Sequence, residues 1–275
     1  MRHRHPLALL LRIAQLSRST FYYRLKAQGL PDPSAGLKAR ICAVYWRHQG
    51  RYGYRRITAD LRRAGQRVNH KKVQRLMQVL GLKSVVRLKK YRSYRGTVSR
   101  VAPNLLNRRF DAARPAQKWV TDVTEFNVNG EKLYLSPVMD LYNGEIVAYE
   151  THRRPVFSLI SDMLKKAFRR LSPEDKPLLH SDQGWQYQQP TYRRMLAERG
   201  LRQSMSRKAN CLDNAAMESF FGTLKAEFFH LNRFESIGQL QDGIRRYIHY
   251  YNYERIKLKL KGLSPVEYRI QALNP

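Results

Sequence analysis

The sequence predicts an all-α, strongly basic N-terminal half followed by an α/β domain, a mixed five-stranded sheet with helices packed on it. The first observation is a change of period. Apolar residues recur with a helical spacing up to about residue 85, and short β-type runs begin at Lys118. The second is the order of the elements predicted after that point, βββαβαβα, which is typical of a mixed sheet covered by helices.

Charge is distributed unevenly along the 275 residues. Residues 1–109 contain 27 Lys and Arg against two acids, whereas the remaining residues contain 25 against 19. This asymmetry indicates a polyanionic partner, because cations that neutralise phosphates release condensed counterions. A membrane surface is the rival polyanion, but the basic half has no amphipathic anchor and no stretch approaches a membrane span. We expect nucleic acid as the partner and no membrane.

The cysteines and the N-terminus indicate a cytoplasmic protein. Cys42 and Cys211 are far apart and form no CxxC pattern, which fits a reducing compartment and excludes a disulfide framework or a Cys-rich zinc site. The apolar run after Pro6 stops at Arg12 with no small-residue cleavage site, so it does not predict a secretory signal.

The first 30 residues predict part of a helix-turn-helix. Residues 7–15 and 18–26 form two short helical patterns, and Ser17 is placed to cap the second. Residues 29–36 then contain Gly and Pro breakers typical of a linker.

Residues 37–85 predict a second, helix-turn-helix-like unit with helices at 37–48, 52–63 and 70–80, the last capped by Asn69. The core face of the third helix would comprise Val73, Leu76, Met77 and Leu80. Its exposed face suits a recognition helix in a major groove and offers as DNA contacts Lys71, Lys72, Gln74 and Arg75. The alternative is a solvated basic face on a structural helix. Because acids are nearly absent from this region, we favour DNA contact.

Residues 86–112 form a basic connector in which tyrosines alternate with cations. Its candidate DNA contacts are Lys89, Lys90, Arg92 and Arg95. Interleaved aromatic and cationic side chains suit phosphate contact and base stacking. A flexible linker is the alternative, and both descriptions are compatible.

The second half begins with two strands joined by Asn129-Gly130, a strong hairpin signal. The strands expected across this half are 119–128, 132–141, 145–151, 177–181 and 201–206, and the helices are 156–171, 191–199 and 213–229. A tail follows, with a helix near 235–253 and a short one from Pro265.

Three carboxylates stand in distinctive surroundings within this basic chain. Asp122 lies mid-strand in Trp-Val-Thr-Asp-Val-Thr, on the face it shares with Val120 and Thr124. Asp182 follows a short apolar strand, and Glu218 lies in a long helix 35 intervening residues later. An Asp–Glu pair at this spacing arises readily by chance, so the local contexts carry the weight. Converging carboxylates hold hard cations, and a pair of such cations breaks and joins phosphodiesters.

Other polar residues near these three need separate interpretations. Lys225 lies on nearly the same helix face as Glu218 two turns later and could reach a phosphate, although a solvated lysine is the alternative. Asp213 is most simply a helix cap, Asp140 is more simply structural, and Glu125 points to the opposite face from Asp122. For His180 a core role is slightly favoured over a role near the site.

Several segments together resemble the second-reading-frame transposases (OrfB) of the IS-three group of bacterial insertion sequences, which are related to retroviral integrases. The carrying segments are Trp119-Val-Thr-Asp-Val-Thr-Glu-Phe, Leu133-Tyr-Leu-Ser-Pro-Val-Met-Asp, His180-Ser-Asp-Gln-Gly-Trp-Gln-Tyr and Ser204–Lys225. Tyr52-Gly-Tyr-Arg-Arg-Ile and residues 68–77 resemble the helix-turn-helix module of that family. Tyr251-Asn-Tyr-Glu-Arg and Leu263-Ser-Pro-Val-Glu-Tyr resemble its C-terminal signature. The likeness covers nearly the whole chain, and Ala209, where Gly is common, is a minor departure.

The resemblance implies an RNase H-like integrase catalytic core at residues 113–232, followed by a C-terminal helical tail at 233–275. It implies Asp122, Asp182 and Glu218 as ligands of Mg²⁺ or Mn²⁺, two ions in all, and Lys225 as the basic residue of the site. The expected reaction is DNA strand cleavage and strand transfer through a circular intermediate. The zinc-binding His/Cys module of retroviral integrases is absent, which fits helix-turn-helix binding.

The same resemblance sets the expected partners and place of action. The partners are double-stranded DNA, as terminal repeats and target, further copies of this chain in a homo-oligomer on DNA, and an upstream-frame protein or fusion. Action on the nucleoid in the bacterial cytoplasm is expected. Two alternatives stay open: a DNA-binding regulator with an inactive catalytic fold, and an RNase H-like nuclease without strand transfer.

Overall fold

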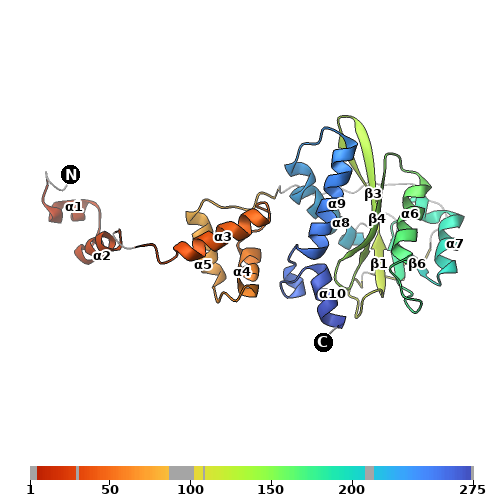
Figure 1. Cartoon of the computed structure of the whole chain (residues 1–275), viewed down its shortest axis with the longest axis horizontal. Coiled ribbons are helices and arrows are strands. Elements are labelled where there is room, and N and C mark those ends of the chain that lie inside the picture. Colours follow the sequence, from red (N-terminus) through yellow and green to blue (C-terminus); the bar gives the residue numbers. More distant parts are fainter. Residues whose placement is uncertain (1–4, 29–30, 87–101, 108, 208–213, 274–275) are drawn as a thin grey trace.

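The computed structural model describes residues 5–28, 31–86, 102–107, 109–207 and 214–273. In Figure 1 the N-terminal helices lie to one side and an α/β domain lies to the other. Within the described ranges, no helix combines the length and apolar character needed to cross a membrane.

The first two helices are α1 (Leu7–Ile13) and α2 (Arg18–Gln28). Ser17 caps α2 as predicted, because its hydroxyl accepts the main-chain N–H of Thr20 at 3.1 Å. Only Leu11 of α1 is buried, so this pair has little core of its own.

Helices α3 (Ala35–Arg47), α4 (Tyr54–Arg63) and α5 (His70–Val79) form the second helical unit, referred to below as the module. Asn69 caps α5 as predicted, since its side-chain oxygen accepts the N–H of Lys71 at 2.9 Å. The module has one hydrophobic core, which contains Ile41, Ile57, Leu61, Val73, Leu76 and Met77. The predicted linker at 29–36 is two residues too long at its C-terminal end, because α3 already begins at Ala35.

The second half contains one mixed sheet. Its strands are β1 (Lys118–Thr121), β2 (Thr124–Val128), β3 (Glu131–Asp140), β4 (Ile146–His152), β5 (Leu178–Ser181) and β6 (Arg202–Met205). Strands β1, β2 and β4 pair antiparallel with β3, whereas β5 pairs parallel with both β1 and β6. Strand β4 pairs only with β3 and lies at one edge.

The count of five strands needs correction, because the sheet formed by the described residues has six. The predicted strand 119–128 is divided at Asp122-Val123 into β1 and β2. The register against β3 is the same on both sides of the break, with Thr121 opposite Val138 and Thr124 opposite Leu135. That register places Pro137 opposite Asp122. A proline offers no N–H to a ladder, and we attribute the lapse in pairing to it.

Helices cover both faces of the sheet (Figure 1). Helices α6 (Phe157–Phe168) and α7 (Pro190–Glu198) pack on one face, in a core shared with Trp119, Val138 and Leu179. Helices α8 (Ala215–Glu227) and α9 (Ile237–Tyr253) pack on the other, in a core shared with Val120, Phe126 and Leu133. Short 3₁₀ turns occur at Trp185–Gln188, Phe229–Leu231 and Leu258–Leu260, and α10 (Pro265–Leu273) ends the described chain.

The C-terminal tail belongs to both halves of the molecule. Helix α9 contributes Ile244, Tyr247 and Tyr251 to the core under the sheet. Three residues past its end, Ile256 is fully buried in the core of the module. The tail therefore joins the module to the α/β domain.

Candidate active site

Asp122 lies at the break between β1 and β2 and is partly buried. Its Oδ1 accepts the N–H of the next residue, Val123, at 2.7 Å. Val120 and Phe126, which precede and follow it on the same alternation, belong to the core beneath α8 and α9. Asp122 therefore faces α8, as the two-residue period predicts.

Asp182 directly follows β5 and is also partly buried. Its Oδ1 accepts the N–H of Gly184 at 2.9 Å, which closes a tight turn before the 3₁₀ turn at Trp185–Gln188. A Cβ at Gly184 would lie 2.9 Å from the same carboxylate oxygen and 2.5 Å from Gln186 Nε2, so a larger residue here would require these side chains to shift. Because β5 is parallel to β1 and adjacent to it, the ends of the two strands bring Asp182 beside Asp122.

The other two predicted residues, Glu218 and Lys225, lie on helix α8. Glu218 lies in its first turn and is partly buried, while Lys225 lies in its last turn. The Lys225 ammonium is 5.3 Å from the centre of the Phe126 ring, on the Asp122 side of the sheet. Phe220, Phe221 and Leu224 of the same helix are buried in the core.

Burial and neighbouring charges shift the pKa values of these four side chains. Burial raises the pKa of Asp122 well above its usual value, and the negative charges of Asp182 and Glu218 raise it further, while Lys225 lowers it. Burial raises the pKa of Asp182, against the Gly184 N–H, and burial also raises that of Glu218. Burial lowers the pKa of Lys225, against the charges of Glu125 and Asp122. Each of these four side chains therefore has a pKa displaced toward its neutral form, and the negative charges of Asp182 and Glu218 act on Asp122.

The donor chemistry of this site fits a divalent cation, since carboxylate oxygens are the ligands that Mg²⁺ and Mn²⁺ prefer. Across the described residues, however, no group of three or more His, Cys, Asp or Glu side chains is close enough together to hold a metal ion. Asp122 and Asp182 lie at adjacent strand ends, whereas Glu218 is on a separate element, helix α8.

Three further residues at this site escaped the sequence reasoning. The Tyr187 hydroxyl is fully buried, 3.5 Å from that of Thr121, and burial and the charges of Asp122 and Asp182 raise its pKa well above normal. Tyr192 is equally buried, and burial and Asp182 raise its pKa as well. Asn214 donates to the Thr121 carbonyl at 3.4 Å and so attaches the start of α8 to β1.

Two of these three residues also have a buried polar atom without a hydrogen-bond partner among the described residues, namely the Tyr192 hydroxyl and Asn214 Oδ1. Asn214 is 4 % exposed. Its position just before a helix could have suggested a cap, but its side chain makes no cap bond. Asp213, predicted as the cap, lies outside the described residues.

The interpretation of His180 as a core residue and of Asp140 as a structural residue is confirmed. His180 is fully buried on β5, and its two ring nitrogens contact the hydroxyls of Ser204 at 2.8 Å and Ser206 at 3.1 Å. Asp140 accepts the N–H groups of Ala116, Tyr142 and the Trp119 indole, and it therefore fixes the end of β3.

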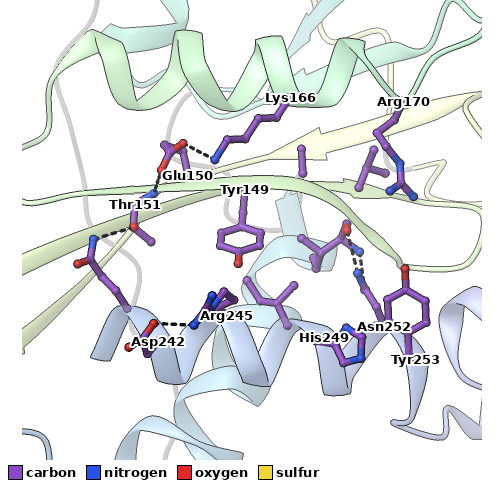
Figure 2. Close-up of a pocket in the computed structure, with 15 residues that line it drawn as sticks. Tyr149, Glu150, Thr151, Lys166, Arg170, Asp242, Arg245, His249, Asn252 and Tyr253 are labelled. Atoms are coloured by element: carbon purple, nitrogen blue, oxygen red, sulfur yellow. Dashed lines mark hydrogen bonds and ion pairs between the residues drawn. The ribbon is translucent and has the colours of Figure 1, made fainter. Parts of the chain in front are cut away.

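A cavity lies elsewhere, between β4, α6 and α9 (Figure 2). Its volume is about 630 Å³. Its cations are all paired, because Lys166 contacts Glu150, Arg245 contacts Asp242 and Arg170 contacts Glu145. Its lining contains none of the predicted catalytic residues.

The candidate DNA contacts divide into two groups. On α5, the side chains of Lys71, Lys72, Gln74 and Arg75 are all exposed, while Val73, Leu76 and Met77 are buried, as the helical period predicts. The contacts predicted in the basic connector lie outside the described residues: Lys89, Lys90, Arg92 and Arg95.

Known protein families match three parts of the chain. An integrase core domain matches residues 112–211, a second integrase core model matches 218–273, and an HTH-like domain matches 34–90. The putative transposase InsK of insertion sequence element IS150 of Escherichia coli (strain K12) is 56% identical over 275 residues, covering 100% of this chain and 97% of that protein.

More distant relatives extend the comparison. The transposase InsF of insertion sequence IS3A of the same organism is 34% identical, covering 83% of this chain and 80% of that protein. Among solved structures, the catalytic core domain of HTLV-2 integrase in complex with magnesium has a TM-score of 0.43 and 14% identity, covering 57% of this chain and 98% of that one. From the near-complete match to InsK, together with the HTH-like and integrase core domains, the chain belongs to the insertion-sequence transposases and is itself a transposase.

Proposed function

We propose that this transposase cuts and joins DNA strands at the ends of an insertion sequence, with Asp122, Asp182 and Glu218 as the ligands of two Mg²⁺ or Mn²⁺ ions. The observation that carries the proposal is the position of the two aspartates, which lie side by side at the ends of the adjacent parallel strands β1 and β5. Glu218 on α8 acts electrostatically on Asp122 from the same side, and a divalent cation would relieve the repulsion among these carboxylates.

When bound there, divalent ions would activate a water or a DNA 3′-hydroxyl for in-line attack and stabilise the leaving 3′-oxygen. The chain supplies the frame for this chemistry. The N–H groups of Val123 and Gly184 each hold one oxygen of an aspartate and leave the other free to bind. Lys225, whose ammonium lies beside Phe126, would bind a phosphate of the DNA end.

The module would hold the DNA. Helix α5 presents Lys71, Lys72, Gln74 and Arg75 to solvent on one face, which suits insertion into a major groove. The substrates would be the terminal repeats of the element and a target duplex. Further copies of the chain, in a homo-oligomer on DNA, would bring two ends together, and an upstream-frame protein or fusion would complete the partial helix-turn-helix at α1 and α2.

Two other functions fit the same fold. A DNA-binding regulator would bind element ends without cutting them, and a nuclease would cut without joining. The charge of the acidic site argues against the regulator, because an idle site gains nothing from partly buried carboxylates that repel one another.

A strand-transfer assay tests the proposal. Labelled duplexes carrying candidate element ends are incubated with Mg²⁺, a target plasmid and either this chain or an upstream-fused version. Joined products support a transposase that acts by strand transfer. Nicked ends without joined products support the nuclease, and intact duplexes with normal binding support the regulator.

A further inference from the structure

A buried contact joins the module to the C-terminal segment, and the proposed chemistry does not require it. Residues 52–57 of the module meet residues 251–256 at the end of α9, beside α3–α5 in Figure 1. The two stretches are the motifs Tyr52-Gly-Tyr-Arg-Arg-Ile and Tyr251-Asn-Tyr-Glu-Arg, to which catalysis assigns no role.

Glu227, the last residue of α8, is the centre of this contact and is 3 % exposed. Arg255 donates to both of its carboxylate oxygens at 2.7 Å. Arg56 of the module donates to one of them at 3.1 Å, and the Tyr247 hydroxyl donates to the other at 3.1 Å. Burial opposes the charge of Glu227, but the two arginines outweigh it and hold its pKa below the usual value.

Main-chain groups add three further bonds across the contact. Arg51 Nε donates to the Glu227 carbonyl at 3.1 Å. The Tyr52 hydroxyl accepts the N–H of Ile256 at 2.7 Å and donates to the Glu254 carbonyl at 3.2 Å. These bonds seat the fully buried side chain of Ile256 in the module core, so the module is completed by a residue of the tail.

Residues around the Glu227 contact also connect the module to the C-terminal segment. His48 stacks on Tyr52 with ring centres 3.8 Å apart, and its Nδ1 lies 3.2 Å from the Tyr250 hydroxyl. Arg63 pairs with Glu267 of α10 at 2.6 Å. Domains joined by small polar surfaces move relative to one another, whereas a buried, multiply bonded surface holds them in one arrangement.

We propose that this contact, the Glu227 clamp (Arg51, Tyr52, Arg56, Glu227, Arg255 and Ile256), sets the distance between the DNA site bound by the module and the phosphodiester cut at the carboxylates. Glu227 is nine residues after Glu218 on the same helix, so the module is anchored to the element that carries a catalytic residue. The inference rests on the proposed function, because it assumes that the carboxylates cut DNA.

The test uses a variant that loosens the clamp without leaving a buried charge alone. Glu227→Gln would leave the buried Arg255 guanidinium without its partner carboxylate. The variant is therefore Arg56→Gln combined with Tyr52→Phe, which keeps the Glu227–Arg255 pair. The matched control is Arg55→Gln, which removes the same charge from the same helix and whose guanidinium bonds to Tyr54 beside it. Thermal unfolding and DNA affinity of all three proteins are measured first.

Cleavage is then measured on duplexes in which the module's site is moved by one to five base pairs from the terminal phosphodiester. The wild type and the control are expected to prefer one spacing. In the clamp variant this preference falls at least tenfold and the cut position spreads, while the affinity for the native end stays within twofold. A folded clamp variant that keeps the wild-type spacing preference would overturn the proposal.

A second readout needs no catalysis. Two labels are attached at Gln78→Cys on α5 and Arg194→Cys on α7, both exposed positions, after Cys42 and Cys211 are replaced by Ser. A single narrow distance distribution is expected in the wild type and the control, and a broad one in the clamp variant. A narrow distribution in the clamp variant contradicts the clamp. Absence of cleavage by the wild type contradicts the proposed function, and the distance distribution still decides the clamp.

Discussion

Pro137 lies opposite Asp122 in the sheet, at the point where the first long strand loses its pairing with β3. At this break in the pairing, the Oδ1 of Asp122 accepts the N–H of Val123. A proline in a central strand is costly because a ladder bond is lost. Here the lost ladder bond is next to Asp122, the residue that we propose as the first metal ligand.

Replacing Asp122 by Asn is expected to stabilise the metal-free protein. Because the pKa of Asp122 is raised in the fold, the ionised carboxylate destabilises it. The penalty is absent below the unfolded pKa, near 3.9, and grows as pH rises through the folded pKa. We expect a gain of about 1 kcal/mol at pH 7 that disappears near pH 4. Denaturant unfolding of both proteins at the two pH values measures it, and an equal gain at both would contradict this explanation.

Divalent ions are expected to reverse that order of stability. Mg²⁺ that binds the folded carboxylates raises the melting temperature of the wild type by mass action. Removing a ligand in Asp122→Asn or Asp182→Asn should abolish most of the rise. Asp162→Asn, an exposed acid paired with Lys165, is the control and should respond as the wild type does. Thermal shift with Mg²⁺, with Mn²⁺ and with EDTA provides the comparison, and equal shifts in all variants would remove these residues from the metal site.

Neutralising Lys71, Lys72 and Arg75 together is expected to weaken DNA binding and flatten its salt dependence. Three lost phosphate contacts reduce the slope of log K against log salt by about 2 to 3. The control replaces three exposed cations of the α/β domain, Lys165, Arg194 and Arg245. Fluorescence anisotropy at several salt concentrations measures both slopes, and an unchanged slope in the α5 variant would exclude this face from the interface.

Glu227→Gln is expected to destabilise the fold at neutral pH by about 3 to 5 kcal/mol, because Arg255 is left as an uncompensated buried charge. The pKa of Glu227 is lowered in the fold, so its contribution is complete above the unfolded pKa and is lost as pH falls through the folded one. The difference between the two proteins should therefore shrink in acid. Unfolding curves at pH 7 and at about pH 3 test this, and a difference that is constant with pH would count against the ion pairs.

The elements that hold the candidate residues could be predicted from the sequence, because each carboxylate has local signals. Asp182 follows an apolar strand, and the spacing of Glu218 and Lys225 on one helix follows from 3.6 residues per turn. The break at Asp122 was missed because it depends on Pro137 across the sheet, and no pattern within residues 119–128 shows a cross-strand partner.

The contacts between distant segments also could not be predicted from the sequence. Glu227 looks like an ordinary polar residue at a helix end, and its partners Arg56 and Arg255 are far from it in the chain. Asn214 and Tyr187 are further examples, since their importance comes from Thr121 on another element. Local periodicity reports which face of an element is buried, but it does not report which other element covers that face.

The central claim is that Asp122, Asp182 and Glu218 act as one metal-dependent site. The most direct measurement is the rate of strand cleavage and joining on element ends by Asp122→Asn, Asp182→Asn and Glu218→Gln, with DNA affinity measured in parallel. We predict a loss of about a thousandfold or more in each variant, as for residues that act as a unit, with affinity within a few fold of the wild type. Full activity in any one of the three variants would contradict the assignment.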